Sequence, residues 1–280
     1  MATTMTPFTT TRPVGALLRE WRERRRLSQL ALALDADVSA RHVSFLETGR
    51  SRPSREMLLR LMERLEVPLR ERNALLLAAG FAPAFPERPL DDPALAEARA
   101  AIARVLAGHE PYPALAVDRH WTLVMANRAV APLLEGVAPE LLQPPVNVLR
   151  LSLHPGGLAP RIANLAEWRA HLLQRLRHQV ERSGDPRLAD VLGELQTLSA
   201  EAAHDAPEER EITLGGVAVP LRLRGETGPL TLLSTTMIFG TPVDVTLSEL
   251  AVEAFFPADA LTAEALADLF NRHIAQEESS

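Results

Sequence analysis

The residues whose types and spacing predict chemistry most clearly lie between Ser39 and Glu47. Val43 and Leu46 are three positions apart, which places them on one face of a helix, and Ser39 is a good N-cap for that helix. The opposite face carries a small residue, a cation, a hydroxyl and an aromatic ring: Ala40, Arg41, Ser44 and Phe45. A helix with such a face suits the major groove of DNA, and the pattern predicts that these side chains contact base edges there.

Several of these side chains also have simpler explanations. Arg41 is predicted either to donate two hydrogen bonds to a guanine or to bind a phosphate, and the two interpretations weigh equally. Phe45 is predicted to contact a thymine methyl group, with a place in the core as the alternative. Arg50 and Arg52 follow in a turn and predict contacts to one phosphate track, and Gln29 in the preceding helix also predicts a phosphate contact.

The elements around this helix predict a small helical domain. Ser28 is expected to cap a preceding helix in which Leu30, Ala31 and Leu34 have core-facing spacing, and Gly49 is expected to end the second helix. Three further helices are predicted, one from Val14 and two after the turn. The first is indicated by the apolar residues Leu17, Leu18 and Trp21. The second follows Ser54 and has the apolar positions Leu58, Leu61, Met62 and Leu65, and the third spans 71–79 and ends at Gly80.

Residues 14–80 resemble the phage-repressor type of helix-turn-helix, the Xre or Cro/C1 family. The matching segments are Leu27–Gln29, Val38–Ser39, Phe45–Glu47 and Gly49–Ser54. This resemblance implies a five-helix bundle that binds DNA. It also implies that Arg22 pairs with Glu47 and so sets the docking angle of the second helix. One departure is that Leu30 and Ala31 stand where relatives often have glutamates, which removes the second half of a capping box.

Composition and charge narrow the class of protein. The chain has 280 residues, 46% of them hydrophobic, which is enough for about two folded domains. Its net charge is −6, yet residues 12–75 carry 14 arginines against nine acidic residues. A basic N-terminal part joined to an acidic remainder is typical of a DNA reader with a separate sensor. The absence of cysteine excludes disulfides and thiolate metal sites, and no signal or membrane segment is recognisable, so a cytoplasmic protein is expected.

After a proline-rich stretch the pattern changes to mixed strands and helices. The predicted strands are 114–117, 122–125, 211–214, 217–223, 230–239 and 247–255. The predicted helices are 94–106, 127–134, 164–181 and 186–198, followed by a short helix capped by Thr262. Strands before and after a helical insert indicate an α+β domain with an antiparallel sheet. The whole chain is therefore α+β, an all-α bundle followed by a sheet domain.

Residues 93–257 resemble the MmyB-like ligand-binding domain, a PAS-like module that follows this helix-turn-helix in other proteins. The matching segments are Ala116–Trp121, Ala126–Ala129, Asn147–Arg150, Asn164–Trp168, Asp185–Leu188 and Glu253–Pro257. The resemblance implies a small apolar pocket, with fatty-acid-like molecules as the suspected ligand class. The predicted organisation is a flexible tail (1–12), the helix-turn-helix domain (13–80), a linker (81–92), the ligand-binding domain (93–257) and a C-terminal helix with a tail (258–280).

Five residues of the second domain are candidate ligand contacts. Trp168 and Leu172 lie on the apolar stripe of the long helix, where plain core is the alternative, and Arg175 beside them is predicted either to bind a ligand carboxylate or to be exposed. Asn127 and Asn147 are predicted to be helix caps first and ligand contacts second.

The sequence argues against catalysis and against bound metals or cofactors. His171 and His178 are seven apart, too far for a metal pair on one helix, and no cofactor motif occurs. No nucleophile motif or acid–base cluster indicates an enzyme.

The expected function is a sequence-specific DNA-binding regulator, a homodimer on an operator, that senses a small apolar or fatty-acid-like effector and has no membrane association. The alternative is a DNA-binding regulator whose second domain binds a protein and needs no small molecule.

Overall fold

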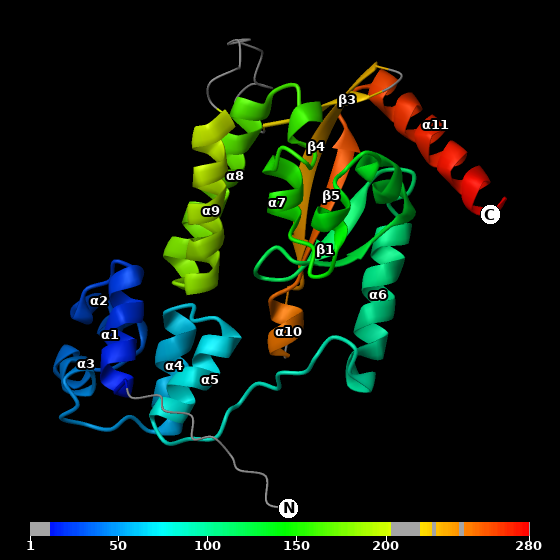
Figure 1. Cartoon of the computed structure of the whole chain (residues 1–280). Helices are drawn as coiled ribbons and strands as arrows, with labels where there is room; N and C mark the ends of the chain where they lie inside the picture. The colour runs from blue at the N-terminus through cyan, green and yellow to red at the C-terminus, as the bar shows by residue number, and fades with distance from the viewer. Residues whose placement is uncertain (1–11, 203–218, 226–227, 241–243, 280) are drawn as a thin grey trace, which may run out of the picture. The chain divides into compact units, whose positions relative to one another are not determined.

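The computed structural model describes residues 12–202, 219–225, 228–240 and 244–279; for 199–202 it describes the backbone only. The chain forms two compact units. The first comprises the chain up to Arg88 together with Asp244 and Val245, and the second comprises the remaining described residues. Figure 1 shows the elements of each unit along the chain. No described helix has the length and hydropathy needed to cross a membrane.

The first unit is a bundle of five helices, as predicted. They are α1 (Val14–Arg24), α2 (Gln29–Asp35), α3 (Ala40–Glu47), α4 (Arg55–Arg64) and α5 (Leu69–Ala78). The serine caps are confirmed: the hydroxyls of Ser28, Ser39 and Ser54 each accept a hydrogen bond from the backbone N–H three residues later. Gly49 follows α3 with a φ of +73°, a left-handed conformation that glycine adopts without a Cβ penalty.

The predicted inner face of α2 is wrong. Leu30 and Leu34 are 59% and 76% exposed, whereas Leu32 and Ala33 are each only 1% exposed and pack in the core of the bundle. A helix of seven residues has two turns, so the spacing of its apolar residues fits more than one face. Packing against α3 and α4 selects the face that contains Leu32.

The first part of the predicted linker is attached to the helical unit. The side chain of Asn73 in α5 donates to the carbonyl of Phe85 and accepts from the backbone N–H groups of Ala84 and Phe85. Arg88 forms an ion pair with the buried Asp244 at 3.0 Å, within the same unit. These contacts place the boundary between the units after Arg88.

The second unit is built on one antiparallel sheet of five strands. The strands are β1 (Ala114–Val117), β2 (Leu123–Ala126), β3 (Leu221–Gly225), β4 (Gly228–Ile238) and β5 (Ala251–Pro257). Their spatial order is β2-β1-β5-β4-β3, so the first hairpin joins the last strand at the centre of the sheet. The β1–β2 hairpin is confirmed, with Leu115 opposite Ala126.

Helices pack on both faces of this sheet. The helical elements after Arg88 are η1 (Pro93–Leu95), α6 (Ala96–Ala107), η2 (Arg128–Leu134), η3 (Pro139–Leu142), α7 (Val148–Leu153), η4 (Ala159–Arg161), α8 (Leu165–Ser183), α9 (Pro186–Ala202), α10 (Val245–Ser248), which begins in the first unit, and α11 (Ala260–Glu277). Ala114 and Ala116 of β1 pack with α6, while Val117 packs with α8 on the other face. Figure 1 shows α6 on one side of the sheet and α7 and α8 on the other.

Five predicted elements differ from the structure or lie wholly or partly outside the described residues. The helix at 127–134 is a 3₁₀ helix that contains Pro132, which cannot donate a helical hydrogen bond. The predicted strand 247–255 begins only at Ala251, because α10 occupies the preceding residues. The strand predicted at 211–214, and the first residues of the strand at 217–223, lie outside the described residues. Asp259 caps α11, whereas Thr262 is buried in its first turn and accepts from the backbone N–H of Thr231.

Candidate nucleic-acid interface and ligand cavity

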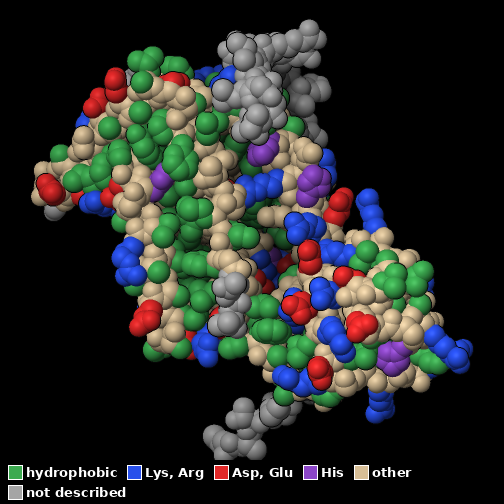
Figure 2. All heavy atoms as spheres, turned by 180° about the vertical axis from the view of Figure 1, so that it is seen from behind, with side chains coloured by type: hydrophobic (Ala, Val, Ile, Leu, Met, Phe, Trp, Pro, Cys, Tyr) green, Lys and Arg blue, Asp and Glu red, His purple; other side chains and the backbone are tan. Residues whose placement is uncertain are grey.

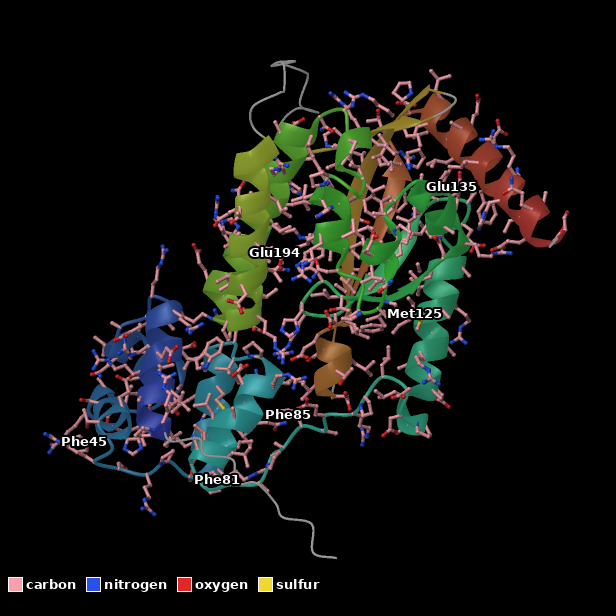
Figure 3. All side chains as sticks on the ribbon, viewed as in Figure 1. Phe45, Phe81, Phe85, Met125, Glu135 and Glu194 are labelled. Atoms are coloured by element: carbon pink, nitrogen blue, oxygen red, sulfur yellow. The ribbon has the colours of Figure 1, made fainter. Side chains whose placement is uncertain are left out.

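The α3 helix has the two faces that its sequence predicts. Val43 and Leu46 are 2% and 1% exposed and belong to the core of the bundle. Arg41 is exposed on the opposite side, and Ala40, Ser44 and Phe45 are partly exposed. Phe45 lies on the surface in Figure 3, outside the packed core, which argues against the alternative of a core ring.

Two arginines flank the ring of Phe45. The guanidinium carbon of Arg41 lies 5.2 Å from the ring centroid, and that of Arg50 lies 5.9 Å from it. Both distances are within the range of a cation–π interaction. The aromatic ring and two cations therefore form one surface at α3 and the turn after it. Apolar contact to a base and positive charge for phosphates are available side by side on this surface.

Arginines near α3 differ from those of α1 in their partners. On α1, Arg19 and Arg24 pair with Glu23 and Glu20. Arg41, Arg50 and Arg52 are exposed and have no carboxylate partner among the described residues. In the space-filling view from behind, basic side chains project from the edge of the helical unit (Figure 2). The positive charge left unneutralised is therefore available to phosphate groups.

A nearly buried ion pair joins α3 to α1. Arg22 Nε and Nη2 donate to the two carboxylate oxygens of Glu47 at 2.6 and 3.0 Å, and the two side chains are 10% and 3% exposed. The hydrogen bond with Glu47 raises the pKa of Arg22, and burial opposes this shift. Arg22 also donates to the carbonyl of Leu27. The pair implied by the first resemblance is thus confirmed.

Gln29 has a contact that the sequence did not predict. Its side-chain amide donates to Glu47 Oε2 at 2.8 Å, so the start of α2 is fixed to the same carboxylate as α1. The amide has a second N–H, and the predicted phosphate contact stays a prediction.

The close approach of α1 and α3 also fixes the position of α3. A Cβ added to Gly15 would lie 2.3 Å from the carbonyl oxygen of Leu46, so only glycine permits this distance between the helices.

An apolar cavity of about 100 Å³ lies inside the second unit. All five strands contribute to its lining, together with η2, α7 and α8. Trp168 and Leu172 are lining residues, as is Trp121 from the β1–β2 turn. The indole N–H groups of the two tryptophans are satisfied by Ser152 Oγ at 3.0 Å and Gln179 Oε1 at 2.8 Å. Their aromatic rings are therefore available to contact apolar atoms.

One buried acid, Glu253 of β5, lines this otherwise apolar cavity. It is 4% exposed, and its carboxylate accepts hydrogen bonds from Arg175 at 2.5 and 3.1 Å and from Thr236 at 2.9 Å. The guanidinium of Arg175 stacks on Trp121, 4.5 Å from its ring centroid. Arg175 is thus neither exposed nor unpaired, and Glu253 occupies the place that the sequence assigned to a ligand carboxylate.

The structure separates the five predicted ligand residues. Trp168 and Leu172 line the cavity, and Arg175 is adjacent through Glu253. Asn127 and Asn147 are not among the lining residues. The expected cap at Asn127 is wrong: its buried amide accepts from Ala114 N and donates to Leu106 O and Tyr112 O, because the end of α6, the segment after it and the start of β1 present these backbone groups. Asn147 is confirmed as a cap, accepting from the N–H groups of Leu149 and Arg150.

Sequence reasoning missed Glu253, Trp121 and Ser152. A charge in the middle of the apolar run Ala251–Pro257 was an available signal, because an acid in a buried strand needs a partner. No such signal distinguished Trp121 or Ser152.

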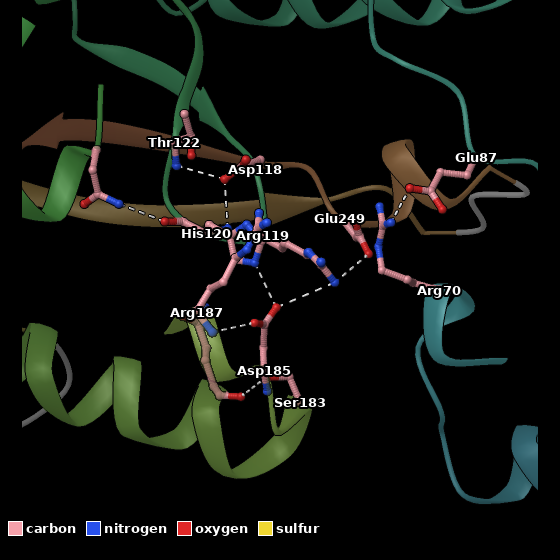
Figure 4. A network of polar contacts seen from close by, with 12 residues as sticks. Arg70, Glu87, Asp118, Arg119, His120, Thr122, Ser183, Asp185, Arg187 and Glu249 are labelled. Carbon is pink, nitrogen blue, oxygen red and sulfur yellow. Dashed lines mark hydrogen bonds and ion pairs between the residues drawn. The ribbon is translucent and has the colours of Figure 1, made fainter. Parts of the chain in front are cut away.

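A polar network fixes the β1–β2 turn beside the cavity (Figure 4). Asp118 accepts from the backbone N–H groups of His120 and Thr122, and His120 Nε2 contacts Asp185 at 2.8 Å. Arg119 lies 3.6 Å from Asp185 and 3.4 Å from Glu249. Burial raises the pKa of Asp185, but the hydrogen bond with His120, the N–H of Arg187 and nearby positive charge outweigh it, so the pKa is lowered overall.

Metal-ligating side chains do not cluster in the part of the chain that the structure describes. No three His, Cys, Asp or Glu residues there lie close enough together to hold an ion. His171 instead stacks on Trp168, with 5.5 Å between ring centroids.

Two known families match the chain, one in each of its two units. Residues 18–72 match the helix-turn-helix family, and residues 98–269 match the family described as MmyB-like transcription regulator ligand binding domain. The fold and the two sites thus define a DNA-binding transcription regulator with a ligand-binding domain. The chain belongs to the MmyB-like family of such regulators.

Comparisons with curated proteins and with solved structures give no information about function. A comparison with curated proteins gives no match. Among solved structures, the chain is similar to one described as an RNA-binding light-oxygen-voltage receptor, at 15% identity and a TM-score of 0.27. The alignment covers 95% of this chain and 65% of that one, and a similarity this low carries no argument about function.

Proposed function

We propose that this regulator is a cytoplasmic homodimer that reads a specific operator through α3 and senses a small apolar effector in its ligand-binding domain. The observation that carries the proposal is the surface of Arg41, Phe45 and Arg50, whose charge is not neutralised while the other face of α3 is anchored in the core. In a dimer, two such heads would span half-sites about 34 Å apart. The effector would act by favouring one arrangement of the heads.

Within this proposal the DNA-contacting residues have separate roles. Arg41 and Phe45 contact base edges, with Ser39, Ala40 and Ser44 at the same face, while Gln29, Arg50 and Arg52 bind phosphates. Changing Arg41 to alanine should reduce discrimination between operators by about 1–3 kcal/mol. Changing Arg52 should weaken binding to all sequences about equally and lower the salt dependence.

Fluorescence anisotropy tests this division of roles. The probe is a duplex selected by the wild-type protein from a randomised library, compared with a scrambled duplex at several salt concentrations. Arg19→Ala is the matched control, because it removes the same charge from α1, where Arg19 pairs with Glu23 at 2.8 Å. Equal losses on both duplexes for Arg41→Ala and Arg52→Ala would refute base reading by Arg41.

The cavity supports an apolar effector, and Glu253 constrains its polar end. At about 100 Å³ the cavity is somewhat smaller than the ~150 Å³ apolar cavity known to bind benzene, so a long chain requires lining side chains to move. A fatty-acid carboxylate at Arg175 would have to displace the carboxylate of Glu253, which already accepts two hydrogen bonds from that guanidinium. We therefore expect a neutral end group to bind better than a carboxylate.

Two measurements test the effector. Native mass spectrometry of the purified full chain should retain a small apolar mass; a domain that never carries one would favour a protein-binding role instead. Quenching or enhancement of Trp168 fluorescence by dodecanol should exceed that by dodecanoate, and Glu253→Gln should shift the preference toward dodecanoate. The same preference in wild type and variant would remove Glu253 from the recognition of the effector.

A further inference from the structure

A second pocket of the ligand-binding unit is lined by arginines. It has a volume of about 200 Å³ and is lined by residues of η2, η4, β3, β4 and α11 and by Glu135 after η2. Arg161, Arg224 and Arg272 line it, and Glu135 is the one acidic lining residue among those that the structure describes. Figure 3 shows Glu135 near α11, the helix that carries Arg272. The three arginines come from three elements, so the tertiary fold brings them together.

These three guanidinium groups have few partners of their own. Arg161 Nη1 donates to the carbonyls of Leu133 and Glu135 at 2.8 and 3.2 Å, and Arg224 Nη1 donates to that of Pro160 at 3.1 Å. Across the described residues, none of the three has a carboxylate within ion-pair distance. Each guanidinium carries five N–H donors, so most of the donors at this pocket are unused by the protein.

The surroundings increase the effect of this charge. Pro132 and Leu230 are buried lining residues, and Ala265, Leu269 and Arg272 are spaced so that they share one side of α11. An apolar wall lowers local screening, which makes three like charges less favourable together and an added anion more favourable. Arginines on an open surface would be more strongly screened by solvent and would attract an anion less.

We propose that this pocket binds a small oxyanion, the phosphate group of a free metabolite or inorganic phosphate itself. Arginine forks match the oxygen geometry of phosphate, and charge-assisted hydrogen bonds are among the strongest in proteins. The pocket is concave and holds about 200 Å³, which admits a phosphate group but not a nucleic-acid duplex. The site shares no lining residue with the apolar cavity.

The bound anion would also be linked, through Arg161, to the wall of the apolar cavity. Arg161 donates to the carbonyl of Leu133 in η2, and Val130, Leu133 and Leu134 of η2 line the cavity. Phosphate on Arg161 would therefore stabilise the position of η2 that the apolar cavity shares.

Isothermal titration calorimetry of the full-length chain with inorganic phosphate, at constant ionic strength, tests the proposal. The test variant is Arg224→Gln with Arg272→Gln, both at exposed positions, so the fold should persist. Arg104→Gln on α6 is the matched control, since this arginine is exposed and lies outside the pocket. We expect the double variant to weaken phosphate binding roughly tenfold or more and the control to leave it unchanged.

A third variant separates this site from the DNA-binding head. Arg52→Gln should leave phosphate binding unchanged while weakening DNA binding. Loss of phosphate binding in Arg52→Gln, or equal affinity in the wild type and the double variant, would overturn the proposal. Because DNA binding is measured separately, failure of the phosphate site leaves the proposed regulator function untouched.

Discussion

The carboxylate of Glu47 provides the sharpest test of how α3 is held. It is 3% exposed as a side chain and accepts hydrogen bonds from Arg22 and Gln29. Glu47→Ala removes the acceptor of all three hydrogen bonds and leaves the nearly buried charge of Arg22 with the carbonyl of Leu27 and, at 3.7 Å, the exposed carboxylate of Glu23. Breaking a buried pair from one side costs about 3–5 kcal/mol. Because Arg22 keeps these two contacts, we expect a loss at the lower end of this range, about 3 kcal/mol.

Hydrogen exchange measured by mass spectrometry reads this loss locally in the intact chain. A loss of about 3 kcal/mol corresponds to roughly a hundredfold faster exchange of the α3 amides. Arg19→Ala is the control, because its pair with Glu23 is exposed and surface pairs contribute about 1 kcal/mol or less. The double variant Arg22→Met with Glu47→Leu should recover most of the protection, since it leaves no uncompensated charge.

The same variants connect the ion pair to DNA binding. Glu47→Ala should weaken binding to all duplexes, because the docking of α3 is loosened while its outer face is intact. Equal exchange rates in Glu47→Ala and Arg19→Ala would refute the argument that this pair positions α3.

Two further predictions concern helix packing and pH. Gly15→Ala should lower the melting temperature and the DNA affinity together, because the new methyl group would lie 2.3 Å from a backbone carbonyl oxygen. Overpacking of this kind typically costs about 1–3 kcal/mol of stability. Ala16→Ser, on the exposed side of α1, is the control. Burial, and then the charge of Arg175, lower the pKa of His171 below 6.5, against weaker opposing effects of Glu253 and Glu167. The unfolded chain therefore binds more protons below that pH, and the stability present above it should decline as the pH falls. His171→Phe should remove this part of the decline between about pH 7.5 and 5.5, whereas the exposed His178→Phe should retain it; identical thermal melts for both variants would contradict the assignment.

Local signals in the sequence determined most of the secondary structure. Serine hydroxyls at Ser28, Ser39 and Ser54 cap helices through their own backbone, so the starts of α2, α3 and α4 follow from the residues alone. The faces of α3 and of the long α8 helix were predictable because each has one consistent apolar stripe. The candidate DNA surface was predictable for the same reason.

Tertiary structure decided what depends on residues far apart in the chain. The buried face of α2 is set by its neighbours, because two turns of helix do not define a face by themselves. Arg175 is paired because β5 brings Glu253 to it, 78 positions away, and a carboxylate already in place changes which ligand can bind. Arg161, Arg224 and Arg272 meet only because η4, the β3–β4 hairpin and α11 surround one pocket. Charges at such distances in sequence carry no local signal, and the fold alone determines which of them are neutralised.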